Sequence, residues 1–320
     1  MISSVKASAP RNYRQTTTIN LTMQTLLVVA TLLAVAPLLW ITGYVLVVGG
    51  SALKLSFLTK DYEAPELATE GEVIEGFPGV EHQGFERDER DGPNLDFVAR
   101  GGVLHGIVGT MIITGLALII VVPIGLMAGV FLAEYPDTWV TVVVRFACDV
   151  LTGAPSIVVG VVAYVLLVRH LGFSALAGSL ALTFLMVPTI TRTTEEMLKL
   201  VPMTIRDAAT ALGSPLWYAT FTVVLPAALP GIVTGVMLAF ARGAGETAPL
   251  ILTAFGNHTL SFDVFGPMHA LPLIVYRFTD SPFPSEHTYA WGGAFVLTMI
   301  VLGANILVRV VTAYTQVKGR

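Results

Sequence analysis

Hydrophobic positions dominate six long stretches of the chain that contain no Asp, Glu, Lys or Arg. The stretches are Gln15–Leu53, Gly101–Ala133, Val150–Val168, Leu171–Thr191, Ala208–Ala241 and His287–Val308. Each is long enough for the roughly 17–25 residues with which a helix crosses the hydrocarbon core of a bilayer. The pattern therefore predicts an all-α membrane protein with six transmembrane helices.

Composition supports this prediction. Charged residues make up 12% of the 320 residues and the mean hydropathy is +0.75, whereas a soluble domain is typically about 25% charged. The first apolar stretch is longer than the core of a signal peptide, which has about 7–15 residues, and no A-x-A-like cleavage site follows it. We therefore expect it to remain in the protein as an anchor.

The distribution of Lys and Arg predicts the orientation. If both termini are cytoplasmic, ten of these residues fall on inner segments and seven on outer ones. Five of the seven belong to one long loop, where the positive-inside rule has little weight. The predicted organisation is a cytoplasmic tail at 1–20, a first transmembrane helix at 21–50, an acidic external loop at 51–100, a five-helix core at 101–315 with a cytoplasmic loop at 195–220, and a cytoplasmic tail at 316–320.

The external loop is strongly acidic. Between Asp61 and Asp96 it carries twelve carboxylates and two arginines, together with several Pro and Gly residues. Such a composition is typical of an extended or weakly ordered segment. It predicts either a solvated spacer or a docking surface for an external partner, and its negative charge disfavours an anion site.

Several classes of function find no support in the sequence. The net charge of −4 gives no sign of a nucleic-acid partner, and the single Cys148 allows no internal disulfide. We also find no phosphate-binding loop and no nucleophile–base arrangement, so we expect no catalytic residues, no cofactor and no enzymatic activity in this chain alone. Six histidines show none of the known metal-ligand spacings, which predicts structural roles and no metal site: His82, His105, His170, His258, His269 and His287.

The segment 192–226 contains more than a simple loop. Thr204 and Asp207 match a helix capping box, and an apolar stripe at i, i+3, i+4 and i+7 follows. Gly213 stands where a left-handed residue ends a helix, and Ser214-Pro215 is typical of the start of another. We expect a short amphipathic helix, a sharp corner and a re-entering helix, with the stripe at Ile205, Ala208, Ala209 and Leu212.

The same segment resembles a signature of the membrane subunits of ATP-binding-cassette importers, E-A-A-x3-G-x9-I-x-L-P. The chain has Asp207-Ala208-Ala209, Gly213, Val223 and Leu225-Pro226 at these positions. In that family the corner is a coupling helix that docks on the ATPase subunit. The resemblance therefore implies a type I importer permease fold, with coupling residues Asp207, Ala208, Ala209, Leu212, Gly213, Ser214 and Pro215.

Longer stretches are similar to the PstA-type permeases of phosphate importers. They include "GTMIITGLALIIVVPIGLMAGVFLAEY", "LTGAPSIVVG", "RTTEEMLKLVP", "LPAALPGIVTGVMLAFARGAGETAPL" and "LPLIVYRFTDSP", which together cover most of residues 100–315. The resemblance implies four kinds of partner: a homologous PstC-like permease, a PstB-like ATPase dimer, a PstS-like external binding protein and membrane lipid. It also implies location in a bacterial inner membrane.

Arg242 and Glu246 are the only charges between Asp207 and Asp263. As one helix, residues 222–256 would extend about 52 Å, well beyond the roughly 30 Å hydrocarbon core. We predict a break marked by Gly243, Gly245 and Pro249, with the two charges beside it.

Three interpretations of these charges remain open. The two side chains pair at i, i+4, although the order of base and acid is the less favourable one; or Arg242 reaches the outer interface; or both face a path for a charged solute. The third fits phosphate, because Arg offers a planar fork to an oxyanion and Glu246 can accept the proton that phosphate keeps and sulfate lacks. The family resemblance likewise implies that this Arg and Glu lie on the path. We name Arg242, Glu246 and Thr247 as path residues, with Arg192 as a weaker candidate whose alternative is an ordinary inner-end anchor.

Other polar residues are expected to be structural. We predict that Arg145 pairs with Asp149, and that Thr193, Thr194, Glu195 and Glu196 cap the following helix. Three G-x-x-x-G spacings predict close helix packing: Gly102/Gly106, Gly125/Gly129 and Gly231/Gly235.

Other functions remain open beside that of a phosphate importer. A molybdate, tungstate or sulfate permease would share the coupling signature. An ion-coupled secondary transporter would require an inverted repeat and paired broken helices, whereas the sequence shows one broken helix and no repeat. An intramembrane enzyme would require a catalytic pair or a metal cluster within the spans, and the sequence shows no such feature.

Overall fold

The computed structural model describes residues 13–67 and 97–318, and the chain divides into two units, residues 1–47 and 48–320. The first unit contains α1 (Tyr13–Tyr44), which begins inside the predicted N-terminal tail. Its side chains from Ile19 onward are largely exposed and apolar, as expected for a helix surrounded by lipid.

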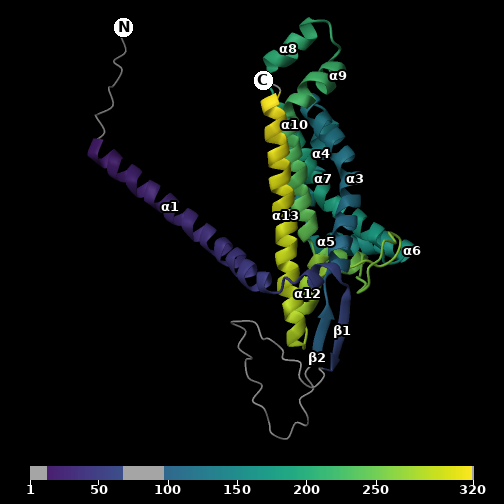
Figure 1. Cartoon of the computed structure of the whole chain (residues 1–320). Helices are drawn as coiled ribbons and strands as arrows, with labels where there is room; N and C mark the ends of the chain where they lie inside the picture. Colours follow the sequence, from purple (N-terminus) through teal and green to yellow (C-terminus); the bar gives the residue numbers. More distant parts are fainter. Residues whose placement is uncertain (1–12, 68–96, 319–320) are drawn as a thin grey trace, which may run out of the picture. The chain divides into compact units, whose positions relative to one another are not determined.

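The second unit holds the remaining elements (Figure 1). A π-helical turn, η1 (Val45–Gly49), leads into it from the first unit. The helices that follow are α2 (Leu55–Thr59), α3 (Leu104–Glu134), α4 (Trp139–Gly153), α5 (Ser156–Ala163), α6 (Arg169–Leu171), α7 (Ala175–Lys199), α8 (Met203–Ala211), α9 (Leu216–Ala219), α10 (Leu225–Gly245), α11 (Ala248–Thr253), α12 (Leu271–Thr279) and α13 (Pro284–Lys318). Two further π-helical turns are η2 (Tyr164–Val168) and η3 (Thr220–Val224).

Within residues 13–67 and 97–318, five helices are long and apolar enough to cross a membrane, and a sixth span is formed if the bent pair α4 and α5–α6 is counted as one. The all-α fold with about six spans is thus as predicted. The third span is not the single stretch Val150–Val168, however, because the helix axis turns by 106° between Gly153 and Ser156. Pro155 explains the bend, since a proline pushes the preceding residue out of the helical region, and Ala154 has ψ 132°.

Helix α7 is the centre of the bundle. Two thirds of its most apolar window is buried, and it packs between α3 and α10. A Cβ on Gly129 of α3 would lie 2.5 Å from Thr194, and one on Gly235 of α10 would lie 2.3 Å from Thr193. The glycine spacings on α3 and α10 therefore permit the close packing that they predict, on two different faces of α7.

The predicted external loop is ordered at both ends. β1 (Tyr62–Leu67) and β2 (Phe97–Gly101) form an antiparallel pair in which Tyr62 lies opposite Gly101. The acidic stretch 68–96, which was predicted to be extended or weakly ordered, lies outside the described residues. In Figure 1 the sheet and α12 lie at one end of the second unit, and α8 and α9 lie at the other.

Candidate coupling and transport sites

The corner between α8 and α9 presents an exposed surface. Gly213 has φ +85°, and a Schellman motif closes the helix, because Gly213 N–H donates to Thr210 and Ser214 N–H donates to Ala209. Leu212 is 88% exposed, whereas Ala209 is buried. The apolar stripe is thus turned mostly outward, as a surface for a partner would be.

Two details of this corner were predicted wrongly. The capping box of Thr204 and Asp207 does not form. Pro202 is the N-cap residue of α8, and no side chain accepts a hydrogen bond from the first turn of this helix. Pro215 rather than Ser214 precedes the first turn of α9. In both cases the fixed φ of proline sets the helix start one or two residues away from the predicted cap.

Arg206 anchors α8 to the bundle. Its guanidinium forms an ion pair with Glu134 at the end of α3, and both side chains are mostly buried. It also donates to the carbonyl oxygen of Leu198 in α7, at 2.9 Å. Arg206 therefore connects α8 with both α3 and α7. Nothing in the sequence indicates this role beyond a basic residue inside the signature helix.

The predicted helix break occurs beside the two isolated charges. α10 ends at Gly245, Glu246 and Thr247 are outside regular helix, and α11 begins at Ala248. The Nε of Arg242 lies 3.7 Å from Oε1 of Glu246, with side chains 40% and 18% exposed. At this distance the pair is an ion pair without a hydrogen bond, which leaves the donors of the guanidinium fork available to another oxyanion.

Arg192 lies elsewhere. It forms ion pairs with Asp149 at 2.5 Å and with Glu195 at 3.5 Å. Gly235 of α10 packs on Thr193, the neighbour of Arg192 in α7, whereas Gly243, the neighbour of Arg242 in α10, packs on Met186. Arg192 and Arg242 are therefore separated by about two helical turns, roughly 10 Å, along the helix axes. The structure brings Arg242, Glu246 and Thr247 together and separates Arg192 from them.

Glu195 organises a cluster of cations. Its side chain is only 4% exposed and accepts hydrogen bonds from Arg145 at 3.0 Å and from Lys199 at 2.6 Å. Two predictions are corrected here. Arg145 pairs with Glu195 rather than with Asp149, and residues 193–196 continue α7 instead of capping the next helix. The reason is that a buried carboxylate is stable only when cations surround it, and α7 must continue to bring Lys199 within reach.

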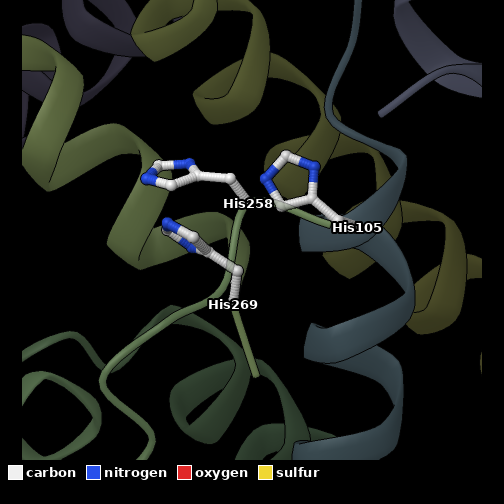
Figure 2. Close-up of side chains that lie close together, drawn as sticks. All are labelled: His105, His258 and His269. Atoms are coloured by element: carbon white, nitrogen blue, oxygen red, sulfur yellow. The ribbon is translucent and has the colours of Figure 1, made fainter. Parts of the chain in front are cut away.

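Three histidines that were expected to be structural converge at the other end of the unit. His105 comes from the first turn of α3, and His258 and His269 come from the loop between α11 and α12 (Figure 2). One ring nitrogen of each lies within 4.8 Å of those of the other two. Burial lowers the pKa of His269 to about 3 and also lowers the pKa of His258. Both imidazoles are therefore neutral at neutral pH.

Comparison with known proteins agrees with this geometry. Residues 122–316 match the family model "Binding-protein-dependent transport system inner membrane component". The phosphate transport system permease protein PstA of Xylella fastidiosa strain Temecula1 is 45% identical over 72% of this chain and 79% of its own length. The protein of the same name from Yersinia pestis is 45% identical over 67% and 74%, and PstA 1 of Mycobacterium tuberculosis strain H37Rv is 42% identical over 64% and 68%.

A solved structure shares the fold. A chain of the MetNI methionine ABC transporter in an inward-facing conformation superposes with a TM-score of 0.52 at 18% identity, over 67% of this chain and 94% of that one. The family model covers more than half of the chain, and the helical arrangement is that of an importer permease. The chain belongs to the family of binding-protein-dependent transport system inner membrane components.

Proposed function

We propose that this chain is a permease subunit of an ATP-driven importer of inorganic phosphate. It forms half of the translocation path and hydrolyses no ATP itself. The other half is a homologous PstC-like permease, the energy comes from a PstB-like ATPase dimer, and a PstS-like protein delivers phosphate from outside. Phosphate is favoured as the solute because the similar proteins from Xylella, Yersinia and Mycobacterium carry the name phosphate transport system permease protein.

The observation that carries the proposal is the exposed turn at Gly213. Exposed apolar side chains gather at this helical corner, namely Leu212 at 88%, Leu216 and Trp217, and such a group is typical of a surface that a partner covers. The ion pair between Arg206 and Glu134 connects that surface to the ends of α3 and α7. We assign ATPase docking to this corner, and we propose that both termini are cytoplasmic, in agreement with the distribution of Lys and Arg.

The solute path passes the break between α10 and α11. Broken helices in transporters occur where backbone and charged groups contact a solute. A charge at the membrane centre costs about 2.5–3.5 kcal/mol on insertion scales, so Arg242 and Glu246 are best explained by a polar path at a subunit seam. Arg242 supplies the anion contact and Glu246 accepts a hydrogen bond from the protonated oxygen of phosphate, with Thr247 beside them. Arg192 is a weaker path residue, because its guanidinium already pairs with Asp149 and Glu195.

Co-purification tests the docking assignment. The complete transporter is solubilised and captured through this chain, and the ATPase that remains bound is quantified. Leu212→Glu and Ala208→Trp should release the ATPase, because each places a charged or bulky group on the docking surface without straining the positive φ of Gly213. Phe262→Glu is the matched control, since Phe262 is 69% exposed in the loop at the opposite end. Retention of the ATPase by both corner variants would contradict the assignment.

A further inference from the structure

We propose that His105, His258 and His269 form a binding site for a divalent transition-metal cation, with zinc as the best match. The ligand atoms are three imidazole nitrogens, all within 4.8 Å of one another. A tetrahedral zinc ion with Zn–N distances of about 2.0–2.1 Å places its ligands about 3.3 Å apart, so small rotations of the rings complete the site. Neutral imidazole suits zinc, copper and nickel, and not the oxygen-seeking magnesium or calcium.

Unpartnered nitrogens in the cluster provide a second observation. His105 is 2% exposed and His269 is 1% exposed. Within the described part of the chain, three buried ring nitrogens have no hydrogen-bond partner: both nitrogens of His105 and Nε2 of His269. Buried polar atoms without partners are costly and rare in native structures. A bound cation would coordinate one nitrogen of each ring and so account for this arrangement.

The surroundings fix the rings in a suitable orientation. Nδ1 of His269 lies 3.2 Å from the carbonyl oxygen of Ala270 and 3.1 Å from the backbone nitrogen of the same residue, so it donates or accepts according to the tautomer. In the tautomer that donates to the carbonyl oxygen, Nε2 carries the free lone pair that a metal requires, which is the usual arrangement of metal-bound histidines, and a bound cation would select that tautomer. His105 and His269 do not stack face to face, because their rings meet nearly at right angles, at 81°. Figure 2 shows the three rings next to one another.

The backbone on both sides is also held in place. A Cβ on Gly109 would lie 1.8 Å from the carbonyl oxygen of His269, so the loop contacts α3 directly at a position where no side chain fits. Leu271 N–H donates to the hydroxyl of Thr110 at 2.8 Å. His269 is therefore fixed against the helix that carries His105, and only His258, the most open of the three, must adjust to bind a cation.

Charge balance is available nearby. The carboxylate of Asp61 interacts electrostatically with His105. Its Oδ2 accepts from Leu260 N–H at 2.9 Å, two residues from His258, and its Oδ1 is buried without a partner in the described structure. Asp61 lies next to the cluster as a negative charge outside the ligand set, and water completes the coordination. The cation would join the loop between α11 and α12 to the start of α3.

Metal titration of the purified full-length chain tests the site. The protein is prepared with a tag that contains no histidine, stripped with a chelator and titrated with Zn²⁺, with Co²⁺ as a spectroscopic probe and Mg²⁺ as a negative control. We expect one Zn²⁺ per chain and the intense visible absorption of four-coordinate Co²⁺. His258→Ala should weaken Zn²⁺ binding by more than the roughly 10–100-fold that loss of an outer-shell partner causes, whereas His170→Ala, which alters an exposed histidine outside the cluster, should leave it unchanged.

Folding is monitored separately. His258→Gln keeps a polar side chain of similar size, and its elution and thermal unfolding midpoint in the absence of metal should match those of the unaltered chain. A stoichiometry near zero for the unaltered chain, or equal Zn²⁺ affinities for the unaltered chain and the two His258 variants, would overturn the proposal. If a variant fails to fold, the Co²⁺ spectrum of the unaltered chain still tests the site: intense visible absorption supports it, and the absence of this absorption contradicts it.

Discussion

Arg206, on the exposed helix α8, forms an ion pair with Glu134 at the C-terminal end of α3. The two residues are 72 positions apart in the sequence. This pair is the direct side-chain connection between the proposed ATPase-docking corner and a helix that packs against the centre of the bundle. It gives the proposed coupling a definite mechanical route.

Breaking this connection should uncouple ATP hydrolysis from transport. Coupling free energies between sites are typically about 1–3 kcal/mol, so Arg206→Ala should lower the phosphate transported per ATP hydrolysed on the order of five-fold or more. Both quantities are measured in the same reconstituted vesicles. Arg309→Ala, which removes an exposed arginine near the end of α13, serves as the control. An unchanged ratio in Arg206→Ala would show that the pair transmits nothing.

Arg242 should be required for uptake and dispensable for assembly. A hydrogen bond to a charged group contributes about 1.5–3 kcal/mol, so Arg242→Ala should reduce phosphate uptake roughly 10-fold to 150-fold. Arg242→Lys should recover only part of it, because an ammonium lacks the planar fork. Arg169→Ala, an exposed arginine at the end of the bent span, is the control. Normal uptake by a fully assembled Arg242→Ala transporter would remove this residue from the path.

Glu246 should control the choice between anions. A carboxylate accepts a hydrogen bond from the protonated oxygen of phosphate but repels sulfate, which has no proton to donate. Glu246→Gln removes the negative charge and adds a donor, so it should raise the inhibition of phosphate uptake by sulfate while reducing phosphate uptake itself. The measurement is the concentration of sulfate that halves uptake of labelled phosphate. If sulfate competes equally weakly against the variant and the unaltered protein, the carboxylate does not discriminate between them.

The two ends of the second unit should lie on opposite sides of the membrane. Cys148 is the only cysteine and is buried, so a Cys148→Ala background permits single-cysteine labelling. Leu212→Cys, in the corner after α8, should react with an impermeant maleimide only from the cytoplasmic face. Phe262→Cys, in the loop before α12, should react only from outside. Labelling of both from one face, or the reverse pattern, would contradict the proposed orientation.

The local pattern of the sequence was sufficient for five of the six spans, the corner at Gly213 and the break after Gly245. Each depends on properties that act within a few residues: hydrophobic length, a positive φ that favours glycine, and helix interruption. The bend at Pro155 was also within reach, because a proline and its preceding residue are restricted locally.

Contacts between distant segments could not be read in the same way. Arg145 was assigned to Asp149 because the two are four residues apart, whereas its partner is Glu195, fifty positions away. The histidines show the same limit, since His105 and His258 become neighbours only when the loop before α12 packs on α3 at Gly109. Spacing in the sequence contains no information about such packing.

Uptake by the reconstituted transporter tests the central claim most directly. Vesicles that contain this chain, its partner permease and the ATPase dimer are supplied with the external binding protein, ATP at the cytoplasmic face and labelled phosphate at the other. The account predicts ATP-dependent accumulation of phosphate that excess sulfate or molybdate does not suppress, and that is lost without the ATPase. Accumulation driven by an ion gradient in the absence of the ATPase, or a preference for molybdate or sulfate over phosphate, would contradict it.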